Sequence, residues 1–299
     1  MPQASVAKSQ LRAGRRLLAR PLLPLVQLVQ LLYLTGPFAR IEEVLEQLQE
    51  PLATAGVNYP EPDLVLAPHR EILRRFEALK EPGAAPATIL DEQHQPLSLL
   101  EALAAEVGQA ILERELEEIN SLLCGPCGCT LCCTGPSPEM AQDFFEIPLA
   151  SAETRLFSLP RIDSPASRAG GSAAEPPLLR EGLPFYQGAP AIYHWHQGWS
   201  LILPRQSLCP QLDEHGGCQI YPHRPQVCRR PQIFAYLLEE QPVPAPPRPG
   251  AEDSPAPVYL ARHKLLAIWD CPYVRTLQDE IARFAEASGL EPVFRANKE

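Results

Sequence analysis

The sequence lacks the motifs that mark the common catalytic and nucleotide-binding sites. It contains no glycine-rich phosphate-binding loop, no G-x-S-x-G motif and no H-E-x-x-H motif. It also lacks an excess of basic residues, because the formal net charge is −10 at pH 7. Binding to phosphates requires a concentrated cationic surface, so we expect no nucleic-acid partner. The missing motifs also weaken the case for an enzyme.

A long apolar run is absent as well. The most apolar stretch, residues 22–34, contains a proline and two glutamines and falls short of the roughly twenty residues that span a bilayer. No A-x-A cleavage site follows it, which argues against a secretory leader. Residues 1–41 nevertheless carry six basic residues and no acidic residue. This segment could pack on the body of the protein or make a peripheral membrane contact, and the packed arrangement is favoured because no strongly polar face opposes the apolar residues.

Proline is abundant and limits the amount of regular structure. The chain has 35 prolines in 299 residues, which is roughly 12% against an average of about 5%. The hydrophobic content of 45% still suffices for a buried core. We therefore expect a loop-rich α+β fold that is mainly α-helical, with N-terminal helices and a small β-hairpin.

The nine cysteines favour reduced thiols over a disulfide framework. A disulfide scaffold is usually short, has an even number of cysteines and follows a secretory leader, and none of these conditions holds here. Adjacent Cys132 and Cys133, together with dense C-x2-C spacing, favour a cytoplasmic protein that binds a metal.

Eight of the cysteines form two clusters. The first places five thiols within ten residues, and the second places three within twenty: Cys124, Cys127, Cys129, Cys132, Cys133, Cys209, Cys218 and Cys228. A C-x2-C spacing lets two thiolates converge on one ion across a tight turn. Gly216-Gly217 and Pro225 shape the backbone beside the second cluster. We predict that all eight thiols contribute to a metal site.

Four further residues near the clusters have two interpretations each. Arg224, Arg229 and Arg230 either place positive charge beside the thiolates or form salt bridges on an acidic protein. Cys271, before Pro272, is either an additional ligand or reactive thiol, or a partly buried cysteine without a metal role.

The remaining pattern predicts the elements that carry the clusters. A long helix should begin at Ser98, capped with Glu101, and run into Cys124, with Gly125 at its end. Residues 192–203 should form a β-hairpin turning at Gln197-Gly198, on which His194 and His196 share one face. We favour a surface role for both histidines over ligation. Leu260, Leu265 and Trp269 indicate a helix, followed by a final helix from Pro272 to Gly289.

The two cysteine stretches resemble the YkgJ-type cysteine-cluster family. In that family a C-x2-C-x2-C-C run precedes a distant C-x-I-Y-x-x-R-P-x-x-C-R run, and residues 218–229 reproduce the second run. Cys129, Cys132 and Cys133 match the first run, whereas its leading cysteine falls on Pro126, with Cys124 and Cys127 nearby. The resemblance covers about residues 124–235. It implies a zinc- or iron-chelating protein, and some members are described as iron–sulfur oxidoreductases.

Four segments and three function classes follow. The segments are a basic apolar start, a helical region, the cysteine-cluster domain with a flexible insertion at about 158–190, and a proline-rich loop with C-terminal helices: 1–41, 42–123, 124–235 and 236–299. The first function class is a protein that holds a [4Fe-4S] cluster, or a zinc or iron ion, and acts in redox chemistry or electron transfer with a protein partner. The alternatives are a zinc-stabilised interaction module and a protein-modifying enzyme that carries a similar cluster.

Overall fold

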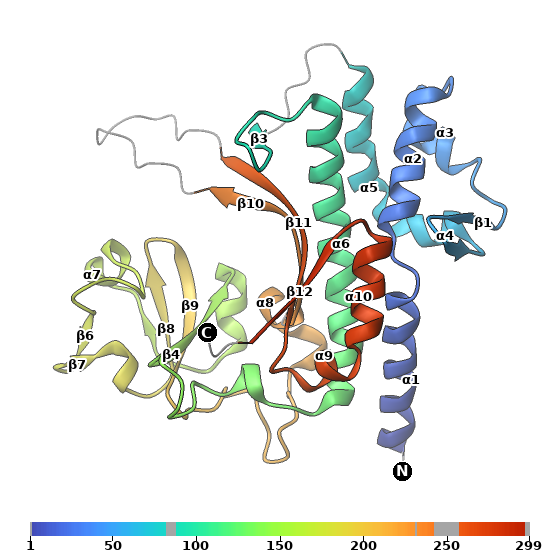
Figure 1. Ribbon diagram of the computed structural model, residues 1–299. Coiled ribbons are helices and arrows are strands. Elements are labelled where there is room, and N and C mark those ends of the chain that lie inside the picture. The colour runs from blue at the N-terminus through green and yellow to red at the C-terminus, as the bar shows by residue number, and fades with distance from the viewer. Residues whose placement is uncertain (1, 82–87, 231, 242–256, 297–299) are drawn as a thin grey trace. The chain divides into compact units, whose positions relative to one another are not determined.

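The computed structural model describes residues 2–81, 88–230, 232–241 and 257–296 (Figure 1). It divides the chain into two compact units. The first unit contains residues up to 122 and residues 232–296, and the second unit contains residues 123–231. Both combine helices with small sheets, so the expected α+β fold is confirmed.

The first unit consists of two layers, one of helices and one built on a sheet. Its helices are α1 (Pro2–Leu18), α2 (Leu23–Thr35), α3 (Ile41–Leu45), α4 (Pro62–Leu66), α5 (Arg70–Leu73), α6 (Leu99–Cys127, which continues into the second unit), α9 (Pro272–Thr276) and α10 (Gln278–Ala287). Two 3-10 helices, η1 (Ala67–His69) and η2 (Arg74–Lys80), flank α5. Its strands are β1 (Leu52–Thr54), β2 (Val57–Tyr59), β3 (Thr88–Leu90), β10 (Ile233–Gln241), β11 (Val258–Ile268) and β12 (Glu291–Arg295).

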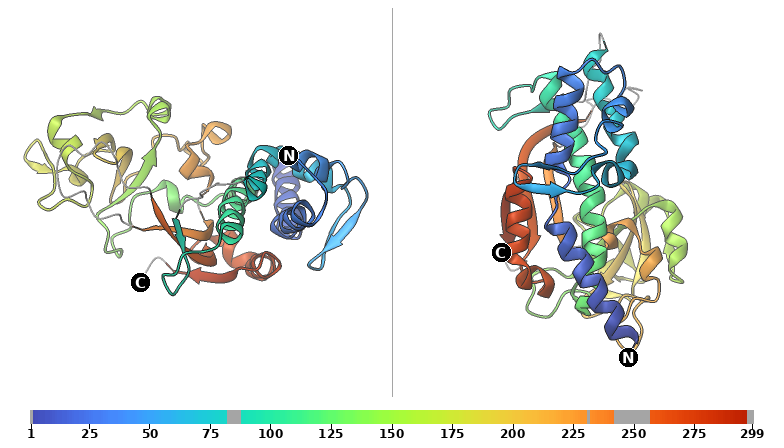
Figure 2. Two further views of the ribbon diagram at one scale, coloured as in Figure 1. Left: turned by 90° about the horizontal axis from the view of Figure 1, so that it is seen from above. Right: turned by 90° about the vertical axis from the view of Figure 1, so that its right-hand side faces the viewer.

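The core of the first unit lies between α2 and α6. Leu25, Val26 and Val29 of α2 are buried in one cluster with Val107 and Ile111 of α6. The two helices lie side by side in both views of Figure 2. The apolar stretch at residues 22–34 is therefore a core helix of this unit.

Among the described residues, no single helix is long and apolar enough to cross a membrane. By length and composition alone, Lys8–Leu18 and Leu23–Thr35 together pass that test as a pair bent by 41°.

The helix predicted around Leu260, Leu265 and Trp269 is wrong, because residues 258–268 form β11. This strand pairs with β10 antiparallel and with β3 and β12 parallel. The register shifts between Tyr236 and Leu238 of β10, and His263 in the opposite strand has a positive φ of 49°. A β-bulge of this kind interrupts the alternation of buried and exposed residues. Because the alternation is interrupted, the spacing of the apolar residues in β11 resembles the spacing that is typical of a helix.

The start of α6 was predicted correctly, and its end lies one turn later than expected. Ser98 and Glu101 form the capping box, with the Glu101 N–H donating to Ser98 Oγ at 3.3 Å and the Ser98 N–H donating to Glu101 Oε2 at 3.0 Å. The helix then continues through Pro126 to Cys127. Gly128, with φ of 63°, adopts the left-handed conformation that was expected at Gly125. Two of the predicted ligands thus lie on the last helical turn.

Asn120 joins the end of α6 to the sheet of the first unit. Its side chain is fully buried, and Nδ2 donates to the Ile233 carbonyl at 2.9 Å. Its Oδ1 accepts from the Ile233 N–H at 3.2 Å and from the Tyr273 hydroxyl at 2.6 Å. Because all of these groups are buried, losing any of them would leave an unsatisfied polar atom. The helix that enters the cysteine-rich region is therefore fixed just before Cys124.

A buried carboxyl group joins α6 to the start of α2. Glu115 is 4% exposed, and its Oε1 accepts a hydrogen bond from the Leu22 N–H at 3.1 Å. This bond satisfies one of the amide groups that a helix start leaves without a partner. Burial raises the pKa of the Glu115 carboxyl well above its usual range, and the Leu22 hydrogen bond opposes the shift. The folded state therefore favours the protonated carboxyl.

We predict that Glu115→Gln will stabilise the protein increasingly as the pH rises. In the parent protein, a carboxyl group whose pKa is raised by folding contributes its full stabilisation below the unfolded-state pKa of about 4.3. This stabilisation is lost as the pH rises through the raised pKa of the folded state. Glutamine keeps the acceptor for Leu22 and cannot ionise. The denaturation midpoint of the variant relative to the parent should therefore increase between pH 4 and pH 8. Glu46→Gln, at an exposed position, is the control, and a Glu115→Gln difference that does not change with pH would contradict the prediction.

The second unit is built around a four-stranded sheet in the order β4-β9-β8-β5. Its strands are β4 (Phe144–Leu149), β5 (Arg161–Ile162), β6 (Leu179–Arg180), β7 (Leu183–Pro184), β8 (Ala191–Trp195) and β9 (Gly198–Pro204). Its helices are α7 (Pro165–Ala169) and α8 (Gln226–Arg229), with 3-10 helices η3 (Leu131–Cys133), η4 (Ser151–Leu156), η5 (Phe185–Gln187) and η6 (Tyr221–His223). Strand β9 pairs with β4 on one side and with β8 on the other, both antiparallel.

The predicted hairpin exists as β8 and β9, with a turn one residue earlier than expected. Trp195 pairs with Gly198, so His196 and Gln197 form the turn. A shift of one residue changes which side chains share a face. Tyr193 therefore lies opposite Ser200, and His194 lies opposite Trp199.

The segment at about 158–190, expected to be a flexible insertion, contains regular elements that pack on the hairpin. Ser167 of α7 is fully buried, and Ser164 caps that helix through its Oγ, which accepts from the Ser167 N–H at 3.1 Å. Phe185 of η5 packs against Tyr193 and Trp195 of β8 with edge-to-face geometry. These contacts make the segment part of the second unit.

Candidate metal centre

All nine cysteines lie in the described part of the chain, and none forms a disulfide. The eight cysteines of the two clusters are half-buried. Cys124 and Cys127 lie on the last turn of α6, and Cys132 and Cys133 lie on η3. The chain turns at Gly128 between these pairs, and the sulfurs of Cys127 and Cys129 lie within 4.8 Å of each other.

Backbone hydrogen bonds bring the two cysteine stretches together. The Cys209 N–H donates to the Cys133 carbonyl at 2.8 Å, and Thr134 forms an antiparallel bridge with Leu208. The next bond in this ladder joins the Gly135 N–H to the Ser207 carbonyl at 2.8 Å. Strand β9 ends at Pro204 and leads directly into this ladder. The fold therefore places residues that are 76 positions apart beside each other.

A closed loop places Cys218 near Cys209. Oδ1 of Asp213 accepts from the N–H groups of His215 and Gly217, both at 2.8 Å. These bonds lower the pKa of the Asp213 carboxyl. Leu212 and Cys218, on either side of this turn, form an isolated antiparallel β-bridge. An Asx-type turn of this kind returns the chain on itself. Both ends of the loop therefore carry a thiol.

Cys228 lies on α8, directly after Pro225. The Cys228 N–H donates to the Pro225 carbonyl at 2.9 Å. The Gln226 N–H, at the start of α8, donates to Oε1 of Glu153 at 2.8 Å. A carboxylate at this end is favourable because the amide groups there carry partial positive charge. These bonds fix the orientation of the turn that carries the third thiol of the second stretch.

The thiols influence one another electrostatically. Burial raises the pKa of Cys124 to about 11 and of Cys228 to about 12, and it also raises the pKa of Cys209. For Cys133 a hydrogen bond with Cys132 is the first cause of a raised pKa, followed by burial. The charge of Cys132 contributes to all four shifts. The thiols therefore lie close enough to repel one another as thiolates, and a cation among them would remove that penalty.

The structure thus brings thiols of both clusters close together within the second unit. Cys132 interacts electrostatically with Cys124, Cys133, Cys209 and Cys228, and Cys209 with Cys218. Cys127 and Cys129 form a close pair on the turn that joins α6 to η3. Cys271 belongs to the first unit, where it is buried at the start of α9. This donor set of sulfurs suits zinc, iron or an iron–sulfur cluster.

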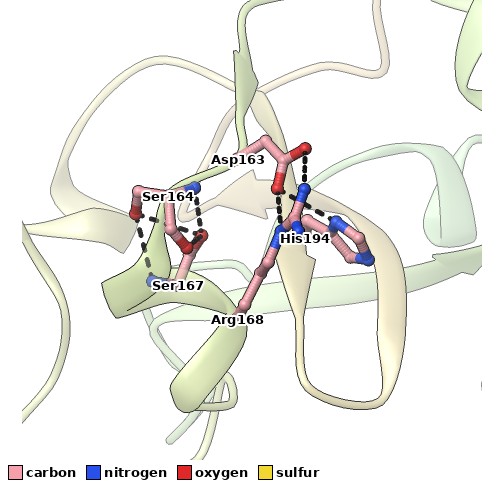
Figure 3. A network of polar contacts seen from close by, with 5 residues as sticks. All are labelled: Asp163, Ser164, Ser167, Arg168 and His194. Carbon is pink, nitrogen blue, oxygen red and sulfur yellow. Dashed lines mark hydrogen bonds and ion pairs between the residues drawn. The ribbon is translucent and has the colours of Figure 1, made fainter.

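The two histidines of the hairpin have partners outside the cysteine stretches. Figure 3 shows Asp163 between Arg168 and His194, with His194 Nδ1 at 3.0 Å from Asp163 Oδ1. The Arg168 hydrogen bonds, and to a smaller extent His194, lower the pKa of Asp163 to about 2. His194 also stacks on Trp199, with ring centroids 4.3 Å apart. The second histidine, His196, uses Nδ1 to contact the Gly170 carbonyl at 2.9 Å.

Residues 123–243 match the family model CxxCxxCC, whose description is "Putative zinc- or iron-chelating domain". This part of the chain is similar to that family, and we call it the cysteine-cluster domain. The resemblance inferred from the motifs at about 124–235 is therefore confirmed, and it supports metal binding by this part of the chain. No curated protein and no solved structure matches the chain.

Two residues of the cysteine-cluster domain have a larger role in the site than the sequence suggested. Arg224 was not distinguished from Arg229 and Arg230, and Tyr221 was given no role. In the structure the Arg224 guanidinium lies over the Tyr221 ring, 3.7 Å from its centroid, and its side chain is buried. The sequence feature that could have predicted this contact is the separation of three residues between Tyr221 and Arg224, because this separation brings two side chains together on a helical turn.

We predict that Gly135→Ala will reduce metal binding by separating the two cysteine stretches. A Cβ at Gly135 would lie 1.8 Å from the Pro204 carbonyl oxygen and 3.0 Å from the Leu203 carbonyl oxygen. Backbone atoms must then move, at a cost of about 1–3 kcal/mol or more. Gly188→Ala is the matched control, because a Cβ there meets nothing within 4 Å. The bound metal per chain, measured by elemental analysis, should fall only in Gly135→Ala, and equal metal content in both variants would contradict the prediction.

Proposed function

We propose that the cysteine-cluster domain binds a [4Fe-4S] cluster and transfers electrons to or from a protein partner. The ligands come mainly from Cys129, Cys132, Cys209, Cys218 and Cys228. The observation that carries the proposal is the hydrogen bond between the Cys133 carbonyl and the Cys209 N–H, because it holds both stretches at one site.

The spacing of the thiols supports a centre larger than one ion. Four thiolates bound tetrahedrally to one zinc ion at about 2.3 Å must lie within about 4 Å of one another. Among the described residues, no three thiols drawn from Cys132, Cys133, Cys209, Cys218 and Cys228 have sulfurs that all lie within 4.8 Å. In a [4Fe-4S] cluster each thiolate binds a different iron, so the sulfurs are farther apart. These five thiols therefore do not form a preassembled tetrahedral zinc site, and this supports our proposal of a cluster over a single zinc ion.

The half-buried position of the thiols supports electron transfer. All eight are neither fully exposed nor fully buried. Partial burial protects a cluster from solvent, while its distance to the surface remains short enough for a partner to approach. The reduction potential of such a cluster depends on nearby charges, hydrogen bonds to sulfur and exposure.

We predict that anaerobically purified protein contains iron and acid-labile sulfide and absorbs visible light. Cys218→Ser and Cys228→Ser should each lower the iron content at least several-fold, since each removes one thiolate ligand. They should also make residues 123–231 more sensitive to proteolysis, because metal binding to such sites can contribute on the order of 10 kcal/mol. Iron and sulfide analysis, absorption spectroscopy and limited proteolysis measure these effects.

His215→Ser is the control for these substitutions. His215 lies in the loop between Cys209 and Cys218, its side chain is 84% exposed, and its ring contacts Glu214 at 3.6 Å. This variant should keep the iron and the colour of the parent. Zinc without colour in the parent would favour the zinc-stabilised interaction module instead. Cysteine variants that stay as metal-loaded and protease-resistant as the parent would refute the site.

A further inference from the structure

Arg224 is the only buried arginine among the described residues, with 7% of its surface exposed. A buried charge is costly unless it is paired, because it loses its hydration. Arg224 lies between η6 and α8, the two turns that lead to Cys228. A negative charge nearby would therefore offset part of the cost of burying Arg224.

Tyr221 holds the Arg224 side chain in one orientation. The Arg224 Nε–H donates to the Tyr221 carbonyl at 3.0 Å, and the guanidinium carbon lies over the ring, 3.7 Å from its centroid. Arginine stacks on aromatic rings better than lysine does, because its cation is planar. The Tyr221 hydroxyl interacts in turn with the Cys124 thiol and the Gly125 N–H. The three residues therefore form a connected group next to α6.

The positive charge of Arg224 acts on thiols from both cysteine stretches. Its side chain hydrogen-bonds to the Cys124 thiol, and it lies close enough to Cys228 for the two groups to interact electrostatically. Cys124 lies on the last turn of α6, whereas Cys228 lies on α8. Arg224 is thus placed where negative charge will accumulate when a metal binds.

We propose that Arg224 is a positioning residue that balances the negative charge of the metal-bound thiolates, with Tyr221 fixing its orientation. This inference rests on the proposed metal centre. A centre of four thiolates around a doubly positive core keeps a net negative charge, whether the core is zinc or an iron–sulfur cluster. In a partly buried site this charge interacts strongly with a nearby cation. Arg224 should therefore stabilise the loaded centre and, in a cluster, favour the more negative reduced state.

The test compares Arg224→Gln, which removes the charge, with Arg224→Lys, which keeps it. Arg161→Gln is the matched control, because Arg161 is an exposed arginine of β5 in the same unit. Metal affinity is measured by chelator competition, and the reduction potential by a spectroscopic redox titration. Residues that support metal ligands typically change affinity by about 10–100-fold when they are replaced. We expect a loss of this size and a more negative potential in Arg224→Gln, smaller changes in Arg224→Lys, and parent-like values in Arg161→Gln.

The outcomes distinguish the inference from the proposed function. Parent protein that binds no metal would refute the proposed function itself. Parent protein that binds metal, together with an Arg224→Gln variant of equal affinity and potential, would overturn only the role of Arg224. Equal losses in Arg224→Gln and Arg224→Lys, including unfolding of both, would also overturn it, because packing and not charge would then explain the effect. Rescue by lysine and the shift of the potential are the results that support it.

Discussion

The cysteine-cluster domain depends on one short ladder of backbone hydrogen bonds. Residues 133–135 pair with residues 207–209, and this ladder continues the chain direction set by β9. Without it the two cysteine stretches would be joined by side-chain contacts such as that of Arg224 with Cys124, and by the long segment between them, which contains β4, η4, α7 and the hairpin. Closing so long a loop costs conformational entropy, which the sheet and its core offset. Gly135 is needed because the ladder passes too close to Pro204 for any side chain.

The long helix α6 contributes to the site in a different way. Asn120 fixes its end by three hydrogen bonds within the first unit, so Cys124 and Cys127 leave a rigid element. The C-terminal end of a helix carries partial negative charge from its free carbonyl groups. This charge disfavours thiolates and favours a cation, as the mutual repulsion of the thiols does. The first cysteine stretch is therefore better suited to a bound metal than to free thiolates.

The sequence predicted the local features of the site and missed the long-range ones. The capping box at Ser98, the hairpin and the metal-binding motifs depend on residues close together in the chain, and the structure or the family match confirms them. Strand β11 was mistaken for a helix because a bulge opposite Leu237 shifts its pattern, and strand partners distant in sequence decide the outcome. The hairpin turn was displaced by one residue because Gly198, with φ of 122°, follows the turn instead of lying in it. The burial of Arg224 could not be predicted, because it depends on tertiary contacts that no local pattern encodes.

The raised pKa values of the thiols impose a cost on metal binding. Protonated thiols do not repel one another, and burial favours the protonated form at Cys124, Cys209 and Cys228. A metal must displace these protons, and each displaced proton weakens its apparent affinity. In the role that we propose, Arg224 lowers this cost by placing a positive charge beside the thiolates, and their negative charge in turn makes the burial of Arg224 more favourable. Arg224 thus links the protonated and the metal-bound states of the thiols, because its burial is least costly when a metal has displaced their protons.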